Sequence, residues 1–461
     1  MNKPLGGADW RIVVDSGGRT LALQDFGVRA RRLARALASA LGLTAALNCP
    51  STALASNTYI VNTTGDPGPM GKLSLRQAVA AAAPGDTVQF DASLTGSTIT
   101  LAMGQINIAQ AVNIVGPGMD RLTINGAGSG RIFYLNCPNP ASEVSISSLS
   151  LTNGAAVSGG GAISSYNCYM VLSNVRATSS HATSGGCITF NCGTIWNSVV
   201  SGCSASSVGG GIQVTDGSAN WQIYESTISS NTAVLGGGGV FLDNASHSNH
   251  LRSTIISQST INNNRVTSQA DLQYGGGGIA VLHSILSLRY STVTQNQSHK
   301  TGGGISFEDP YSADHSNVFR ATVAHNAAYK NSGNGLYVLG GNLLVQYSII
   351  ADNFSIYALT DLFGSFTLNR SLIESPSDAT ITGNGSLIGS DPDLAKLDDN
   401  GGATATMLPN PGSPAIDAIP SCSIAMDQRG LKGCVNGKSD MGAIERQIPE
   451  VIIFRNGFES G

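Results

Sequence analysis

Charged and aromatic side chains are scarce in this chain of 461 residues, at 12% and 6% of the total. A polar chain with 57 glycines and so little charge could be disordered, but 41% of its residues are hydrophobic and they recur in short runs. The composition therefore indicates many short strands joined by tight turns and excludes a mainly helical protein.

A basic surface is also lacking. Residues 1–55 hold seven Lys or Arg and three Asp or Glu, which leaves 18 basic and 26 acidic residues in the remainder. A body with a net charge of −8 argues against nucleic acid as the main partner.

Common catalytic motifs are missing as well. The sequence contains no G-x-S-x-G, H-E-x-x-H or G-x-x-x-x-G-K-[ST] segment and no C-x-x-C pair among its eight cysteines. Disulfides in an oxidising compartment are the preferred interpretation of these cysteines. Cys422 and Cys434 bracket the sequence DQRG and are predicted to pair. The pairing of Cys137, Cys168, Cys187, Cys192 and Cys203 stays open, with Cys168–Cys192 as one option for cysteines that end matching strands.

The N-terminal region has the three parts of an export signal in the expected order. Four arginines between positions 29 and 35 precede a small-apolar run over 36–47, and Ala53-Leu54-Ala55 forms a cleavage site. The run is too short to span a membrane. We expect residues 1–55 to be the signal and the mature protein to begin near Ser56. Residues 1–27 fit no part of a signal, so the true start is expected near Val28; the alternative is an amphipathic helix of the folded domain.

Two repeats run in phase along the rest of the chain. Glycine clusters precede short apolar strands at intervals of 24 to 39 residues. A second pattern, S-T-I-x-x-N and its variants, begins at Ser226, Ser259, Ser291, Ala321 and Ser348 and ends at Asn231, Asn264, Asn296, Asn326 and Asn353. Such self-similarity is typical of a solenoid with one coil per repeat.

The repeats predict an all-β fold, a right-handed parallel β-helix of the pectate-lyase-like type, with roughly 11–13 coils over residues 58–395. The β-branched column of Ile228, Ile261, Val293, Val323 and Ile350 should face inward. Asparagine is expected to take the left-handed bend at one corner and to bond its neighbours along the stack, and glycine to take another corner. Ser74 and Gln77 predict a capping box that opens a short N-terminal capping helix, which Pro84-Gly85 ends.

Three segments resemble known bacterial families. Residues 74–101 resemble the N-terminal module named for a Cys-Ser-Leu-Arg-Glu-Ala motif, although Lys72-Leu73 precede Ser74 and Gln77 replaces the acid. Residues 399–419, DQRG and DMGAIE resemble the choice-of-anchor Q domain, and GGAI with the Asn corners is similar to chlamydial polymorphic outer-membrane proteins. The resemblance implies an N-terminal cap with first coils over 56–135, repeats over 136–395, a closing segment over 396–447 and a tail over 448–461. It brings no established catalytic residue.

One set of polar residues lies at nearly the same offset from the glycines of four successive repeats. Asp216, His283 and Asp309 share the offset, and Asp243 and Glu308 come one residue earlier. Stacked coils would place these side chains along one edge. Asp243, Asp309 and His283 are candidates for glycoside chemistry, and Asp216, Asp243, Glu308 and Asp309 are candidates for binding calcium. The alternative is that these residues only end strands and solvate turns.

Two functions from different classes follow. The first is a secreted or cell-surface protein of a Gram-negative bacterium, a monomer without a transmembrane span, that adheres to a polysaccharide or cell-surface glycan without catalysis. The second is a polysaccharide lyase or glycoside hydrolase that acts on an extracellular polysaccharide. The fold alone does not decide between them.

Overall fold

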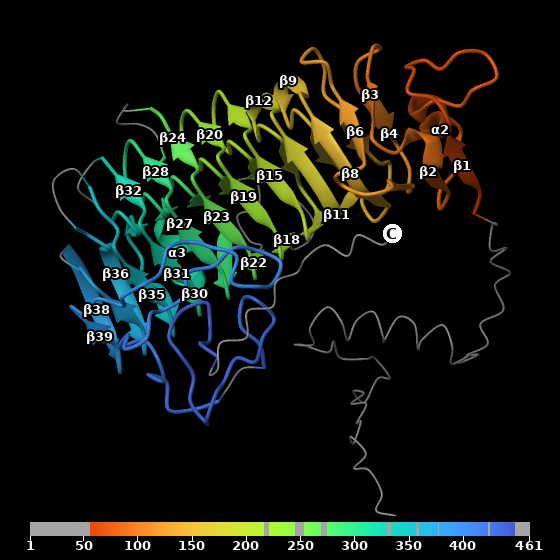
Figure 1. Ribbon diagram of the computed structural model, residues 1–461. Coiled ribbons are helices and arrows are strands. Elements are labelled where there is room, and N and C mark those ends of the chain that lie inside the picture. Colours follow the sequence, from red (N-terminus) through yellow and green to blue (C-terminus); the bar gives the residue numbers. More distant parts are fainter. Residues whose placement is uncertain are drawn as a thin grey trace, which may run out of the picture. The chain divides into compact units, whose positions relative to one another are not determined.

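Short strands in which every second side chain is apolar alternate with sharp corners through most of the chain. The computed structural model describes residues 56–447, except 216–220, 245–252, 269–273, 330–332, 356–358, 377 and 423–424. The predicted export signal and tail lie outside the described residues. The described strands pair in parallel and form a right-handed β-helix of about 11 turns, so the predicted fold is confirmed (Figure 1).

The strand that follows each glycine corner belongs to the first face of the helix. Its register is constant, with Ile212 opposite Val240 and Val240 opposite Ile279. The strands of the first face are β4 (Ile106–Ile108), β7 (Phe133–Asn136), β10 (Ile163–Tyr166), β13 (Ile188–Phe190), β17 (Ile212–Val214), β21 (Val240–Asp243), β25 (Ile279–Leu282), β29 (Ile305–Phe307), β33 (Leu336–Val338) and the start of β36 (Leu362–Asn369).

The second and third faces follow in each coil. Strands β8 (Glu143–Thr152) and β11 (Tyr169–Thr178) run through both faces. The other strands of the second face are β1 (Thr58–Val61), β2 (Thr87–Phe90), β5 (Asn113–Val115), β14 (Gly193–Trp196), β18 (Trp221–Tyr224), β22 (Ser253–Ser257), β26 (Ile285–Arg289), β30 (Asn317–Phe319), β34 (Leu343–Gln346), β36 and β38 (Asp378–Asn384). The other strands of the third face are β3 (Ser97–Thr100), β6 (Leu122–Asn125), β15 (Val199–Ser201), β19 (Thr227–Ser229), β23 (Thr260–Asn262), β27 (Thr292–Thr294), β31 (Thr322–Ala324), β35 (Ile349–Ala351), β37 (Leu372–Ile373) and β39 (Leu387–Ile388).

A short fourth row completes the coil before the next glycine corner. Its seven strands are β9 (Ala155–Gly159), β12 (His181–Ser184), β16 (Ser204–Ala205), β20 (Thr232–Ala233), β24 (Arg265–Val266), β28 (Gln297–Ser298) and β32 (Ala327–Ala328). Inside the coils, the predicted column of Ile228, Ile261, Val293, Val323 and Ile350 is fully buried, as expected. Each such side chain contributes about 1.5–3 kcal/mol relative to an exposed one.

The asparagines form a continuous row of buried amides between the third face and the fourth row. Asn264 donates from Nδ2 to the Ile228 carbonyl of the preceding coil and to Asn296 Oδ1 of the next coil, at 2.9 Å each. Its own Oδ1 accepts from the backbone N–H and the Nδ2 of Asn231. The same bonds link Asn296 to Asn326 and Asn326 to Asn353. Every polar atom of these amides therefore has a partner inside the helix.

The expectation that these asparagines take the left-handed bend is wrong. The residue before each of them has the positive φ, and these residues are Ser230, Asn263, Gln295, His325 and Asp352. The asparagine side chain is buried and held by hydrogen bonds, and the preceding residue, which is exposed or half-buried, turns the chain. Glycine does take the predicted corner, with positive φ at Gly209, Gly237, Gly276, Gly302 and Gly333, among others.

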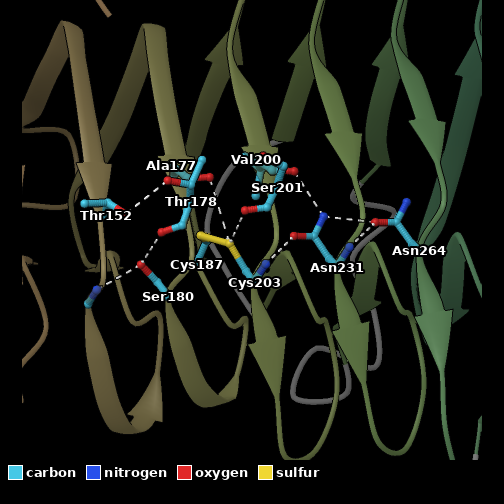
Figure 2. The surroundings of a disulfide bond; sticks show 11 residues. Thr152, Ala177, Thr178, Ser180, Cys187, Val200, Ser201, Cys203, Asn231 and Asn264 are labelled. Carbon is cyan, nitrogen blue, oxygen red and sulfur yellow. Dashed lines mark hydrogen bonds between the residues drawn. A yellow bond between two sulfur atoms is a disulfide. The ribbon is translucent and has the colours of Figure 1, made fainter. Parts of the chain in front are cut away.

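Cysteine replaces asparagine at the N-terminal end of this row. The backbone N–H of Cys203 donates to Asn231 Oδ1 at 3.0 Å, and its sulfur is bonded to Cys187 of the same coil (Figure 2). A second disulfide joins Cys137 to Cys168 of the next coil, so the Cys168–Cys192 option is wrong. Cys168 and Cys137 follow strands that pair directly, which brings their sulfur atoms together.

The N-terminal end of the helix is covered by α2 (Leu75–Ala81), and a single 3-10 turn, η1 (Ala92–Leu94), follows β2. Both hydrogen bonds of the capping box are present, because Ser74 Oγ accepts from the N–H of Gln77 and Gln77 Oε1 accepts from the N–H of Ser74. Leu75, Ala78 and Val79 are buried in the main core. The predicted capping helix is thus present, and it covers apolar side chains that would otherwise face water.

The segment of residues 396–447 contains turns and isolated bridges and lies across the outside of the third face. Gln428 Nε2 donates to Thr260 Oγ1 at 3.0 Å, and Thr292 Oγ1 donates to Gln428 Oε1 at 2.7 Å. Further along, the N–H of Ala443 donates to Thr322 Oγ1 at 3.1 Å. A disulfide joins Cys422 and Cys434 within the segment.

The DQRG and DMGAIE sequences hold this segment together. Asp427 and Arg429 form a fully buried ion pair at 2.9 Å, and Arg429 Nη2 donates to the Glu445 carbonyl. The Glu445 side chain accepts from the N–H groups of Val435 and Asp440. Burial raises the pKa of Glu445 to about 8. These charged residues are structural, since each is committed to partners within the segment.

Removing one amide from the asparagine row should cost stability. Asn264→Ala leaves the N–H of Asn231 and one of its two Nδ2 hydrogens without an acceptor, since the other hydrogen still donates to the Val200 carbonyl, and each buried orphan costs about 1–3 kcal/mol. We expect a loss of about 2–5 kcal/mol in chemical denaturation. Asn263→Gly is the matched control, because Asn263 is exposed and glycine tolerates its positive φ. A similar loss in both variants would contradict the role given to the row.

The carboxyl group of Asp361 lies at the C-terminal end of the asparagine row, and it should make the folding stability of the protein depend on pH. Asn353 Nδ2 donates to Asp361 Oδ1 at 2.8 Å, and burial raises the pKa of Asp361 to about 7 although Asn353 and Ser375 donate to it. Between its unfolded pKa and about 7, the folded state holds a proton that the unfolded state has lost. Stability should therefore fall as pH rises through this window, by roughly 1.4 kcal/mol per pH unit for this group.

The measurement is the denaturation midpoint from pH 5 to pH 8.5. Asp361→Asn should show a shallower loss with rising pH than the wild type, whatever its absolute stability. Asp399→Asn, at an exposed position, should keep the wild-type slope. Equal slopes in all three proteins would show that Asp361 does not titrate in this window.

Candidate functional site

Three of the predicted site residues come together at the ends of the first-face strands. Asp243 ends β21, His283 follows β25, and Asp309 follows β29. Asp243 Oδ1 lies 3.3 Å from His283 Nδ1, and the His283 N–H donates to Asp309 Oδ2 at 2.7 Å. Asp216, the remaining residue at the shared offset, lies outside the described residues.

The acids of this edge are already bonded to the protein. Asp309 is the N-cap of α3 (Pro310–His315), and both its oxygens accept from Ser312. Glu308 Oε1 accepts from the N–H of Gly275 at 2.7 Å. In the parts of the chain that the structure describes, no three His, Cys, Asp or Glu side chains are placed to hold a metal ion. Among the described residues, the edge therefore supplies a carboxylate–imidazole pair; calcium binding stays a prediction, because Asp216 lies outside the described residues.

An open groove over the first face was not singled out by the sequence. Its volume is about 530 Å³. Its lining consists of Gln105, Arg131, Tyr134, Ser158, Gly159, Ser164, Tyr166, Thr183, Ser184, Thr189 and Gln213. Every lining residue except Arg131 is uncharged, and most carry a hydroxyl or amide group. A neighbouring hollow of about 430 Å³ shares Gln105, Arg131 and Ser158 with it and extends to His181.

The floor of the groove is one row of outward side chains. Tyr134, Ser164, Thr189 and Gln213 lie opposite one another in β7, β10, β13 and β17. Their neighbours along each strand are buried in the core, as the alternation of a strand requires. We call this set the outward row.

Arg131 stands at one end of the outward row and is held firmly. Its Nε donates to the Gly160 carbonyl at 2.9 Å, its Nη1 to Gln105 Oε1 at 2.7 Å and its Nη2 to Ser158 Oγ at 2.9 Å. The guanidinium carbon also lies 5.2 Å from the centre of the Tyr134 ring. Burial lowers the pKa of Arg131, and the nearby Tyr134 opposes this. The arginine thus bridges two coils and fixes the Tyr134 ring.

The other end of the row is closed by apolar contacts. Phe241 continues the row after Gln213 but is 2% exposed, because it packs in a small core with Val208 and Ala280. The Tyr274 ring lies 5.4 Å from the Phe241 ring. Within the groove the outward row therefore covers four strands and ends at Phe241; at its other end, Asn107 of β4 lies opposite Tyr134 and is exposed, but it is not part of the groove lining.

The outward row occupies one fixed position of the repeat in the sequence. In each repeat the residue after the first apolar residue of the strand faces outward. This position holds Ser164, Thr189 and Gln213 in successive coils and then Phe241 and Ala280. The residue types differ from coil to coil, so the position carries no repeated letter.

The fold defines the class of protein, a right-handed parallel β-helix, and comparisons with known proteins agree. No family model matches the chain, and no curated protein matches its sequence. Among solved structures, it is similar to pectate lyase Pel9A, with a TM-score of 0.51 and 13% identity over 85% of this chain and 97% of that chain. At this identity the likeness shows the fold alone.

Two further structures are more distant. The A-module of the mannuronan C-5 epimerase AlgE4 of Azotobacter vinelandii has a TM-score of 0.35 and 13% identity over 68% of this chain and 90% of that chain. Tailspike protein 3 of bacteriophage CBA120 has a TM-score of 0.30 and 15% identity over 67% of this chain and 56% of that chain. The resemblances to the surface-protein modules remain predictions.

Two findings bear on where the protein works. The three disulfides within the described residues are typical of proteins in oxidising compartments. None of the described helices is long and apolar enough to cross a membrane.

The function of the acidic edge is tested by replacing Asp243 and Asp309 together. Asp243→Asn with Asp309→Asn removes both negative charges and keeps an oxygen that can cap α3. We expect unchanged glycan binding, sugar release and thermal response to calcium. Asp309→Ala alone should cost about 0.5–2 kcal/mol through the lost cap. Loss of turnover or of a calcium response in the double variant would assign the function to this edge.

Proposed function

We propose that this chain is a secreted or cell-surface protein that binds a polysaccharide or cell-surface glycan along the groove, without catalysis. The observation that carries the proposal is the outward row, which sets one aromatic ring and three uncharged polar groups side by side on a rigid sheet. Hydroxyl and amide groups donate and accept hydrogen bonds, as sugar hydroxyls do. An aromatic ring offers an apolar surface for the C–H face of a sugar.

Several observations support an extracellular, non-catalytic role. Among the described residues, no carboxylate lines the groove, whereas glycoside hydrolysis generally needs two. The three disulfides and the predicted export signal fit a protein that works outside the cytoplasm. The resemblance to bacterial surface β-helix proteins favours adhesion at a Gram-negative surface, by a monomer.

The second candidate function is a polysaccharide lyase or glycoside hydrolase. The 3.3 Å contact between Asp243 and His283 favours it, because a carboxylate can orient an imidazole for proton transfer. The groove and this edge belong to different coils, so one set of variants separates the two functions.

The test combines glycan binding with product release by the full chain on a polysaccharide panel. Tyr134→Ala should weaken binding about tenfold, equivalent to about 1.4 kcal/mol. Tyr134→Phe should keep most of the affinity because it keeps the ring. Tyr329→Ala, which removes a partly exposed tyrosine after β32, is the matched control and should bind as the wild type. Release of reducing or unsaturated sugars would contradict the non-catalytic role.

A further inference from the structure

We infer that the groove takes an uncharged polysaccharide in an extended conformation, which lies along the helix axis with about one sugar per coil over about four coils. The inference rests on the proposed function and adds the class of glycan, its direction and the length that is bound.

The charge of the lining selects against acidic glycans. Of the lining residues that the structure describes, Arg131 is the one that is charged, and its Nε, Nη1 and Nη2 already donate to Gly160, Gln105 and Ser158. A polyuronate would bring one carboxylate per sugar to a surface with no further cation. Apart from the one carboxylate that could approach Arg131, the carboxylates would lose part of their hydration without gaining an ionic partner, which is unfavourable. A neutral sugar meets no such penalty.

The geometry of the outward row sets the direction of the chain. Neighbouring parallel strands lie about 4.8 Å apart, so Tyr134, Ser164, Thr189 and Gln213 repeat at this interval along the axis. This interval is close to the length of one pyranose unit in an extended chain. A polysaccharide parallel to the axis can therefore present each successive sugar to an equivalent position.

The covered end of the row limits the length that is bound. Phe241 is packed against Val208 and Ala280 and lies beside the Tyr274 ring, so the position after Gln213 is filled by protein. The contacts end there, and added sugars gain no further hydrogen bonds. Affinity should therefore rise with chain length and then level off.

The experiment measures the affinity of the full chain for neutral oligosaccharides of increasing length, from gluco-, xylo-, manno- and galacto-series. The acidic probes are oligogalacturonate and oligomannuronate of the same lengths. We expect one or more neutral series to bind, with affinity rising up to about four sugars and then constant. The acidic series should bind at least tenfold more weakly at every length, and salt should change neutral binding little.

Gln213→Ala tests the far end of the row and should lower the plateau to the affinity of an oligosaccharide one unit shorter. Gln297→Ala, on β28 of the fourth row, is the matched control and should change nothing. Tighter binding of acidic probes, or affinity that keeps rising well beyond four sugars, overturns this inference while Tyr134→Ala still weakens binding. If no glycan binds, or if Tyr134→Ala has no effect on any series, the proposed function itself fails.

Discussion

The buried amide row is the constraint on which the rest of the structure depends. Each asparagine bonds to the coil before it and the coil after it, so no coil can rotate or slip without breaking bonds that water cannot replace. A slip of one residue would also turn the apolar column outward. Because the register is fixed from coil to coil, side chains at the same offset become neighbours, and both the outward row and the acidic edge arise in this way.

Much of the fold could be predicted because an interaction that recurs in every coil requires the same residue type at the same position of each repeat. The apolar column needs β-branched residues and the amide row needs asparagine, so Ile228 and Asn231 recur with their equivalents in the sequence. The left-handed corner before each asparagine does not require one residue type, so no residue recurs at this position of the sequence. Its residues are exposed or half-buried, and serine, asparagine, glutamine, histidine and aspartate all occupy it. The pattern therefore indicated that a corner was present but placed the bend one residue late.

The candidate sites were less predictable, for two physical reasons. Equal offsets predicted that Asp243, His283 and Asp309 would be close, and they are. The offsets did not show that Asp309 would cap α3, since that depends on a loop found in one coil. The groove was missed because tyrosine, serine, threonine and glutamine can each contribute to a polar surface, and because its far boundary depends on how Tyr274 packs.

The two halves of the helix are fastened by different chemistry. In the first half, the Cys137–Cys168 disulfide joins two neighbouring coils, and the Cys187–Cys203 disulfide links two corners of one coil. In the second half, Gln428 and Ala443 form hydrogen bonds with threonines of β23, β27 and β31. A segment close to the end of the described residues therefore links three coils that precede it in the sequence. The C-terminal coils gain these bonds only from residues 428–443, which come later in the chain, and a thiol reductant would loosen the two halves unequally.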